Sequence, residues 1–361
     1  MTADKKKIEE LRKEISKIDK NIVQLLDSRT ALAKKIGQIK NQLEIPIIDL
    51  EREKKILDEI TKKVDHLTKK QLHTIYKNII AISRAVQGSQ KRVALLGPAG
   101  TYSEQAAKIY FSEAEADFVI TKDINDIFRK VIAKEVDYGV VPVENSTFGS
   151  VPVTLDLLLE SNLKIVGEII LRIKLNLIAL KKIPLSEIKT LLSHENPLGQ
   201  CRKFIEENLS QAKIIKTKST SKAVELISKY EDAAAIGTEL AAELYERLII
   251  SKRIEDNQNN YTRFFVIGHE ETEVSGNDKT SIVFSVRHVP GALLAALKSF
   301  SSRNINLTKL ESRPSRLTPW EYYFYTDFEG HISDDSIKEA LKELKKNTLF
   351  IKILGSYPTK S

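Results

Sequence analysis

The stretch VALLGPAGTYSEQAAKIY, residues 93–110, is where the chain changes from a helical to a mixed pattern. It predicts a short apolar strand, a glycine-rich turn and a helix with Ser103 as its cap. Such a turn can bind an anion on free backbone N–H groups. It has neither the G-x-G-x-x-G spacing nor the G-K-[ST] ending of a P-loop, which disfavours nucleotide binding.

Composition separates residues 1–90 from the rest of the chain. They hold 20 Lys and Arg against 13 Asp and Glu, and thus +7 of the net charge of +8. Gly37 and Gly88 are their only glycines, and Pro46 is their only proline. This contrast predicts a helical domain with a boundary near residues 87–92. The positive charge would suit nucleic acid, a membrane surface or a small anion, and composition alone does not choose.

The whole chain has the composition of a soluble globular protein. Its 361 residues, 42% hydrophobic and 29% charged, predict two to four domains and exclude disorder and collagen. Cys201 is the single cysteine, and the six histidines lack metal-binding spacing, so we expect neither a disulfide nor a metal site. The polar N-terminus and the lack of a long apolar run predict a cytoplasmic protein without membrane contact.

The N-terminal region carries a heptad series of apolar residues, which are Ile8, Leu11, Ile15, Ile18, Ile22, Leu25, Leu32, Ile36, Ile39 and Leu43. The series predicts one helix from about residue 5 to 42, about 57 Å long, which needs a second chain to cover it. Shorter helices are expected at 49–64 and 68–87, with Pro46 blocking continuation of the first.

Arg29 interrupts the apolar series at the position due between Leu25 and Leu32. It either sets the register between helices or is held inward to bind an anion, since an unpaired buried charge is costly. Lys40 shares its helix face, whereas Arg12 lies about 25 Å away along the helix and would reach only the site of an antiparallel partner. Other polar residues share helix faces: Asp49, Arg52 and Glu53, and Ser83 and Gln87.

These eight polar positions, with L-R-x-x-I-x-x-I-D at 11–19 and S-x-x-x-Q at 83–87, resemble the all-helical chorismate mutases over residues 5–90. The resemblance implies a three-helix protomer in an intertwined dimer, with chorismate as substrate. The rearrangement of this dianion to prephenate needs no cofactor or proton transfer, only a folded substrate and a stabilised ether oxygen. The eight residues would divide the work: Arg29 and the partner's Arg12 on the carboxylates, Lys40 and Gln87 on the ether oxygen, Arg52 and Glu53 on the ring hydroxyl, with Asp49 and Ser83 completing the site.

Three later segments place polar residues where apolar strands end, at 136–151, 191–201 and 256–268. Such positions are typical of a cleft. The alternation of strands and helices predicts two α/β lobes, one of residues 92–170 plus 255–269 and one of residues 171–254, with the ligand between them.

These segments resemble the prephenate dehydratases, through G-P-x-G-T-x-S at 97–103, P-V-E-N-S at 142–146 and T-R-F at 262–264. Ser193, Gln200 and Cys201 match a further motif, in which Glu195 and Asn196 replace the expected Pro-Gln. Prephenate would lose carbon dioxide and its ring hydroxyl to become phenylpyruvate. The resemblance implies Thr262 as partner of that hydroxyl, against a plain strand role. It implies other substrate contacts by Glu144, Asn145, Ser193 and Gln200, and by Gly100, Thr101, Ser146, Arg263 and Phe264. Cys201 is interpreted as a packing residue.

Residues 279–358 follow a strand, helix, strand, strand, helix, strand pattern, which predicts a ferredoxin-like fold with Ser333 capping its second helix. The segment lacks a catalytic constellation and a basic-aromatic stripe for RNA. It resembles the regulatory ACT domain and implies phenylalanine as effector. The effector-binding residues would be Gly291, Ala292 and Leu293, and Glu311, Ser312, Arg313 and Pro314, against a plain helix and turn.

We therefore expect a multidomain chain, with an all-α three-helix mutase domain at 1–90, an α/β bilobed dehydratase domain at 91–270 and an α+β ferredoxin-like ACT domain at 279–358. The leading hypothesis is a bifunctional chorismate mutase and prephenate dehydratase inhibited by phenylalanine, without a cofactor or nucleic-acid partner, as a homodimer or larger homo-oligomer. Two alternatives stay open. One is a dehydratase whose helices only dimerise, and the other is a non-enzymatic amino-acid sensor.

Overall fold

The computed structural model describes residues 3–43, 45, 49–60, 66–112, 115–315 and 321–359. The chain forms two compact units, one of Met1–Lys91 with Phe111–Asp117 and one of Arg92–Tyr110 with Phe118–Ser361. Among the described residues, no helix is both long and apolar enough to cross a membrane.

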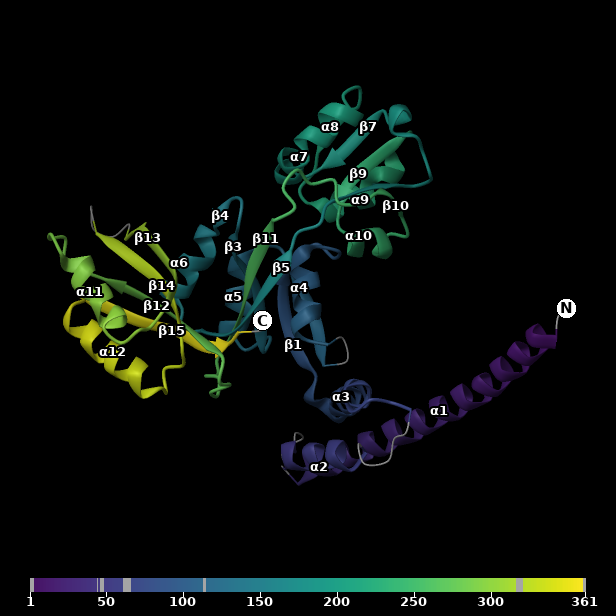
Figure 1. The fold of residues 1–361 in the computed structure, drawn as a ribbon, viewed down its shortest axis with the longest axis horizontal. Helices are drawn as coiled ribbons and strands as arrows, with labels where there is room; N and C mark the ends of the chain where they lie inside the picture. Colours follow the sequence, from purple (N-terminus) through teal and green to yellow (C-terminus); the bar gives the residue numbers. More distant parts are fainter. Residues whose placement is uncertain are drawn as a thin grey trace. The chain divides into compact units, whose positions relative to one another are not determined.

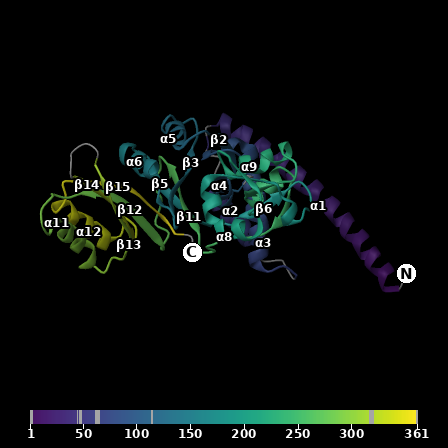
Figure 2. The same cartoon turned by 90° about the horizontal axis from the view of Figure 1, so that it is seen from above.

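The first unit is helical, with α1 at Ala3–Gln42, α2 at Leu50–Ile60 and α3 at Lys69–Arg84, followed by a π-helical turn at Ala85–Ser89. The predicted single long helix is confirmed (Figure 2). Thr68 and Gln71 form a capping box at the start of α3, which explains why this helix begins there. The end expected for the second helix, residues 61–64, lies outside the described residues.

The larger unit contains the predicted two lobes (Figure 1). The first lobe has the sheet order β2-β1-β3-β11-β5, with β4 paired to β3. Its strands are β1 (Lys91–Leu96), β2 (Ala116–Thr121), β3 (Tyr138–Asn145), β4 (Gly149–Ser150), β5 (Lys164–Arg172) and β11 (Tyr261–Gly268). Its helices are α4 (Tyr102–Tyr110), α5 (Ile124–Ile132) and α6 (Pro152–Glu160). The return of the chain through β11 between β3 and β5 explains why residues near 260 join the first lobe.

The second lobe lies in sequence between β5 and β11, and its sheet order is β10-β6-β9-β7-β8. The strands are β6 (Asn176–Ala179), β7 (Thr190–Ser193), β8 (Lys213–Lys216), β9 (Ala233–Gly237) and β10 (Leu248–Ser251). Helices α7 (Glu195–Gln200), α8 (Arg202–Asn208), α9 (Thr220–Leu226) and α10 (Glu239–Leu244) follow the strands, with short 3-10 turns at Leu185–Glu187 and Ile227–Lys229.

The C-terminal segment has the predicted ferredoxin-like order of elements, with the antiparallel sheet β13-β14-β12-β15. The elements are β12 (Asp278–Ser285), α11 (Ala292–Ser301), β13 (Leu307–Pro314), β14 (Tyr322–Glu329), α12 (Asp335–Lys346) and β15 (Phe350–Pro358). Both helices cover one face of this sheet (Figures 1 and 2). The other face shares a hydrophobic core with the first lobe, in which Tyr325, Leu354 and Tyr357 pack with Val143 and Phe265.

Two capping predictions were wrong. The helix α4 begins at Tyr102, so Ser103 lies in its first turn, where it is buried. The N-cap position of α12 is Asp334 instead of Ser333, and the Asp334 side chain forms no capping hydrogen bond to the helix. The Asp334 carboxylate accepts the backbone N–H of His331 at 2.8 Å, and this contact stabilises the turn that enters the helix.

Candidate active sites

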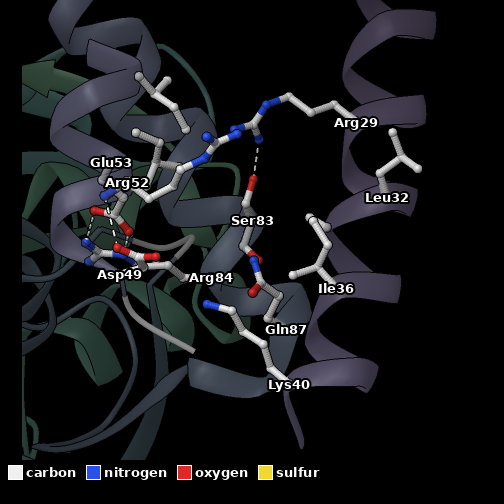
Figure 3. A pocket seen from close by; sticks show the side chains of 13 residues that line it. Arg29, Leu32, Ile36, Lys40, Asp49, Arg52, Glu53, Ser83, Arg84 and Gln87 are labelled. Atoms are coloured by element: carbon white, nitrogen blue, oxygen red, sulfur yellow. Dashed lines mark hydrogen bonds and ion pairs between the residues drawn. The ribbon is translucent and has the colours of Figure 1, made fainter. Parts of the chain in front are cut away.

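In the helical unit, an open cavity of about 400 Å³ lies between α1, α2 and α3. Figure 3 shows Arg29 and Lys40 extending from α1 toward the side chains of the other two helices. The lining brings together seven of the eight polar residues predicted for a mutase site, which are Arg29, Lys40, Asp49, Arg52, Glu53, Ser83 and Gln87. The apolar lining consists of Leu32, Ala33, Ile36, Ile56 and Ile80.

The inward direction of Arg29 has a local cause. Its guanidinium donates to the Ser83 hydroxyl and, at 3.5 Å, to the carbonyl of Ile79. The Ser83 hydroxyl in turn donates to the same carbonyl at 2.8 Å. Ser83 therefore holds the positive charge in the cavity, at the point where it interrupts the apolar series of α1.

Arg84 lines the same cavity, and the sequence analysis missed it. Its guanidinium forms a two-point pair with Glu53, and the Nε–Oε1 distance is 2.7 Å. The hydrogen bond to Glu53 raises the pKa of Arg84. In the sequence, Arg84 directly follows the predicted site residue Ser83. Adjacent helix residues point in different directions, so this position did not predict that Arg84 enters the cavity. Only the packing of α2 on α3 shows its contact with Glu53.

Two other predicted residues are positioned by backbone contacts. Asp49 precedes α2 and accepts the N–H of Arg52 at 2.9 Å, so it caps that helix. The Gln87 amide nitrogen donates one N–H to the Ser83 carbonyl at 3.0 Å, so its second N–H can donate to a ligand. Gly37 permits the close approach of α1, because a Cβ there would lie 2.7 Å from the Cα of Gln87.

The charges of the cavity suit an anion. Its lining includes four cationic side chains, Arg29, Lys40, Arg52 and Arg84, against the two carboxylates Asp49 and Glu53. The formal sum is +2, equal and opposite to the charge of a dicarboxylate. Arg12 lies outside this cavity, with a side chain 71% exposed and paired to Glu9 at 3.2 Å.

A second polar group lies where β3 and β11 pair, with Asn145 opposite Thr262. The Asn145 Nδ2 atom donates to the Thr262 hydroxyl at 2.9 Å. The Oδ1 atom of the same amide accepts the N–H groups of Thr147 at 3.0 Å and Phe148 at 3.1 Å. Because those donors fix which end of the amide is oxygen, the Thr262 oxygen is an acceptor here and its O–H stays available to another group.

Neighbouring predicted residues fasten this corner of the fold. Ser146 accepts the N–H of Tyr261 at 2.9 Å and donates to the carbonyl of Asn259 at 3.3 Å. Arg263 pairs with Glu168 at 2.8 Å and with Asp327. Phe264 is buried. Arg263 and Phe264 thus point into the protein interior, and their expected substrate contacts stay a prediction.

The glycine-rich turn joins the two lobes. The Gly100 carbonyl accepts the Thr238 hydroxyl at 2.6 Å, and its N–H donates to Glu104 at 2.6 Å. Gly100 has φ +79°, and a Cβ there would lie 3.0 Å from Ala241. The Thr101 hydroxyl donates to the Leu96 carbonyl at 3.2 Å. Substrate binding by this turn also stays a prediction.

The predicted residues of the second lobe have structural contacts. Ser193 is buried and donates to the Ile236 carbonyl at 3.2 Å, while Gln200 ends α7. Among the described residues, no hydrogen bond links either side chain to Thr262. Glu195, at the motif's departure, pairs with Lys216 at 2.7 Å. Burial raises the pKa of the Cys201 thiol, which fits packing and opposes a nucleophilic role.

The predicted effector residues lie on two elements of the C-terminal sheet domain. Gly291 precedes α11 with φ +84°, a left-handed conformation that favours glycine. Ala292 and Leu293 open that helix, and Leu294 beside them is 61% exposed. On β13, Ser312 and Pro314 are exposed, while Glu311 contacts Ser150 and Arg313 pairs with Asp156 at 2.9 Å. In this motif, Glu311 and Arg313 therefore project to one side of β13, and Ser312 and Pro314 project to the other.

These features define a multidomain enzyme with a helical unit that contains a cationic cavity, a bilobed α/β domain and a small regulatory-type domain. Family models match in the same order, with chorismate mutase type II at residues 11–88, prephenate dehydratase at 93–272 and the ACT domain at 280–346.

Comparison with known proteins agrees over nearly the whole chain. It is 43% identical to the bifunctional chorismate mutase/prephenate dehydratase of Aquifex aeolicus, with 97% of this chain and 98% of that protein covered. It is 35% identical to the protein of the same name from Pseudomonas aeruginosa, with 99% of each covered. A solved prephenate dehydratase from Arthrobacter aurescens, in complex with L-Phe, covers 74% of this chain and 90% of its own at 32% identity and a TM-score of 0.68. The chain belongs to the family of bifunctional chorismate mutase/prephenate dehydratases.

Proposed function

We propose that the cavity between α1, α2 and α3 rearranges chorismate to prephenate. The observation that supports this proposal best is that four cationic side chains and two carboxylates line one cavity. Arg29 binds a substrate carboxylate, and Lys40 with the second N–H of Gln87 stabilises charge on the breaking ether oxygen. Glu53, held by Arg84, and Arg52, whose backbone is held by Asp49, bind the ring hydroxyl.

Arg12 completes this site from a second copy of the chain. The apolar series of α1 is uncovered in the single chain, with Leu25 70% exposed and Leu32 61% exposed. Exposed apolar stripes of this length bind a partner helix, and a homodimer covers them with the same stripe. An antiparallel pair also brings Arg12 of the partner subunit toward Arg29.

The second reaction converts prephenate to phenylpyruvate, carbon dioxide and water at the end of β3 and β11. Thr262 supports this assignment, because its O–H is free to donate while its oxygen accepts from Asn145. A donated hydrogen bond helps the ring hydroxyl leave as the carboxylate departs and the ring becomes aromatic. Glu144, Asn145, Ser193 and Gln200 position the substrate, and Gly100, Thr101, Ser146, Arg263 and Phe264 shape its binding site.

Phenylalanine binds the C-terminal domain near Gly291 and the exposed side of β13 and lowers dehydratase activity. This proposal is supported by the solved prephenate dehydratase in complex with L-Phe, which is similar to 74% of this chain. Two further predictions remain. They are the domain boundaries at 1–90, 91–270 and 279–358, and the cytoplasmic location.

Two parallel incubations test both activities. Purified full-length chain is given chorismate in one and prephenate in the other, and prephenate and phenylpyruvate are followed together. The proposal expects prephenate first and phenylpyruvate after it. Consumption of supplied prephenate without consumption of chorismate would leave a dehydratase with a dimerising helical module. Binding of phenylalanine with neither reaction would leave an amino-acid sensor.

A further inference from the structure

The C-terminal sheet contacts the Asn145–Thr262 corner through a lysine that no motif contains. Lys309 lies on β13, and its ammonium group is 2.9 Å from a Glu144 carboxylate oxygen and 3.1 Å from a Glu311 carboxylate oxygen. It also donates to the Ser150 hydroxyl at 3.0 Å. The Lys309 side chain is only 12% exposed, while those of Glu144 and Glu311 are 37% and 26% exposed, so water screens these contacts in part.

The strand pairing connects this contact to Thr262. Glu144 is paired with Arg263, and the next pair along is Asn145 with Thr262. Paired residues share one face of a sheet and successive residues alternate, so the two pairs project from opposite faces. The register shifts directly after Arg263, and a bulge of this kind directs side chains at the end of a strand.

The partner strand has a matching contact. Arg263 of β11 forms an ion pair with Asp327 of β14. Its guanidinium also donates a hydrogen bond to the Tyr357 hydroxyl at 3.0 Å. The C-terminal domain therefore holds β3 through Lys309 and β11 through Asp327, one residue away from Asn145 and Thr262 in each strand.

The charge of Lys309 explains what its loss would do. The ammonium group lies between the carboxylates of Glu144 and Glu311. Without it, two negative charges in a partly buried place repel each other, and only the Ser150 hydroxyl would remain between Glu311 and the strand. Glu144 would turn away, and the backbone would carry Asn145 with it.

We propose that Lys309 is a positioning residue for the dehydratase, which holds Glu144 so that the neighbouring Asn145 directs its amide at Thr262. The inference rests on the proposed dehydratase site. It also makes the C-terminal domain part of the catalytic geometry, because a shift of β13 reaches Thr262 through two residues.

The test uses the full-length chain with Lys309→Met, assayed on prephenate. We expect kcat to fall about tenfold with KM changed less than twofold, because alignment is lost and binding is not. Lys309→Arg should recover most of the turnover. Chorismate mutase activity of the same preparation should be unchanged and measures the folded enzyme. Lys338→Met is the matched control, since that lysine pairs with Asp335 at 3.0 Å on the exposed surface of the same domain.

A double-mutant cycle identifies the route of the effect. In a Glu144→Gln background, Lys309→Met should have no further effect on kcat, since no carboxylate remains to be held. An equal loss in both backgrounds, unchanged kcat in Lys309→Met, or equal loss of both enzyme activities would overturn the proposal. If Lys309→Met does not fold, Lys309→Gln in the same cycle decides by the same criteria. A wild-type chain that never consumes prephenate would instead refute the dehydratase assignment.

Discussion

Arg29 is a charged residue in an apolar helix series, and its contacts give that position a purpose. The hydroxyl of Ser83 holds the Arg29 guanidinium toward α3. Leu32 and Ile36, which lie on α1 with Arg29, form part of the apolar lining of the cavity. A cation held in this way is ready for a carboxylate before the substrate arrives, so little reorganisation is needed on binding.

Replacing Arg29 with alanine should reduce mutase kcat/KM at least a hundredfold, equivalent to about 3 kcal/mol of transition-state stabilisation. The measurement is the rate of chorismate loss. Dehydration of supplied prephenate should stay at the wild-type rate. Lys34→Ala, which removes an exposed cation from the same helix, is the control. Normal turnover of chorismate by Arg29→Ala would show that this residue only sets helix register.

Thr262 supports a second prediction at this scale. Thr262→Ala should lower dehydratase kcat about a hundredfold with little change in KM, because a donor used mainly in the transition state is lost. Thr262→Ser keeps the hydroxyl and should retain much more activity. Steady-state kinetics on prephenate check both variants, with mutase activity as the internal control. Full turnover by the alanine variant would leave Thr262 as an ordinary strand residue.

At the scale of elements, α1 does two jobs. Its C-terminal half lines the cavity through Arg29 and Lys40, its N-terminal half carries Arg12, and the exposed apolar series runs along both halves. Because Arg12 does not reach the cavity of its own chain, α1 contributes to two sites only if its Arg12 enters the cavity of a partner chain.

Mixing the inactive variants Arg12→Ala and Arg29→Ala tests this arrangement. In each mixed dimer, one composite site has both arginines, so random exchange should restore about a quarter of wild-type mutase activity. The assay is chorismate loss after subunit exchange, which mass labelling of one variant verifies. Mixed dimers that remain inactive would contradict a site shared between chains.

At the scale of the whole chain, the C-terminal domain is joined to the first lobe by a common core. Tyr325, Leu354 and Tyr357 pack with Val143 and Phe265. Deleting the domain would expose that core, so truncation after Gly268 would confuse loss of regulation with loss of stability. Point substitutions at the effector residues are the better test.

Gly291→Ala should weaken inhibition by phenylalanine at least tenfold, because a left-handed backbone before α11 favours glycine and a side chain would disturb the ligand's approach. Dehydratase activity without phenylalanine should remain. Gly276→Ala is a matched control, with φ +90° and an equally open surrounding, and should keep wild-type inhibition. The measurement is the phenylalanine concentration that halves prephenate turnover. Equal inhibition of both variants would place the effector elsewhere.

Local sequence patterns were sufficient for much of this structure. The apolar heptads predicted one long helix, because apolar residues on one face of an α-helix recur every three to four positions in the sequence. The alternation of strands and helices predicted two lobes, and the spacing of Arg29 and Lys40 predicted that they share a helix face. The resemblance to chorismate mutases added Glu53 to the same site, and all three residues line the cavity. The predictions that failed, the caps at Ser103 and Ser333, concern helix ends, where a shift of one residue costs little free energy.

By itself, the sequence determined the order of the domains, the periodicity of the helices and the residue types at both sites. Only the tertiary structure decided which side chains meet over long separations: Arg84 on Glu53, Asn145 on Thr262, and Lys309 on Glu144. The physical reason is that hydrogen bonds and ion pairs depend on distances of about 3 Å between atoms. Residue spacing determines such distances within one helix or strand, whereas between elements they depend on packing and strand register.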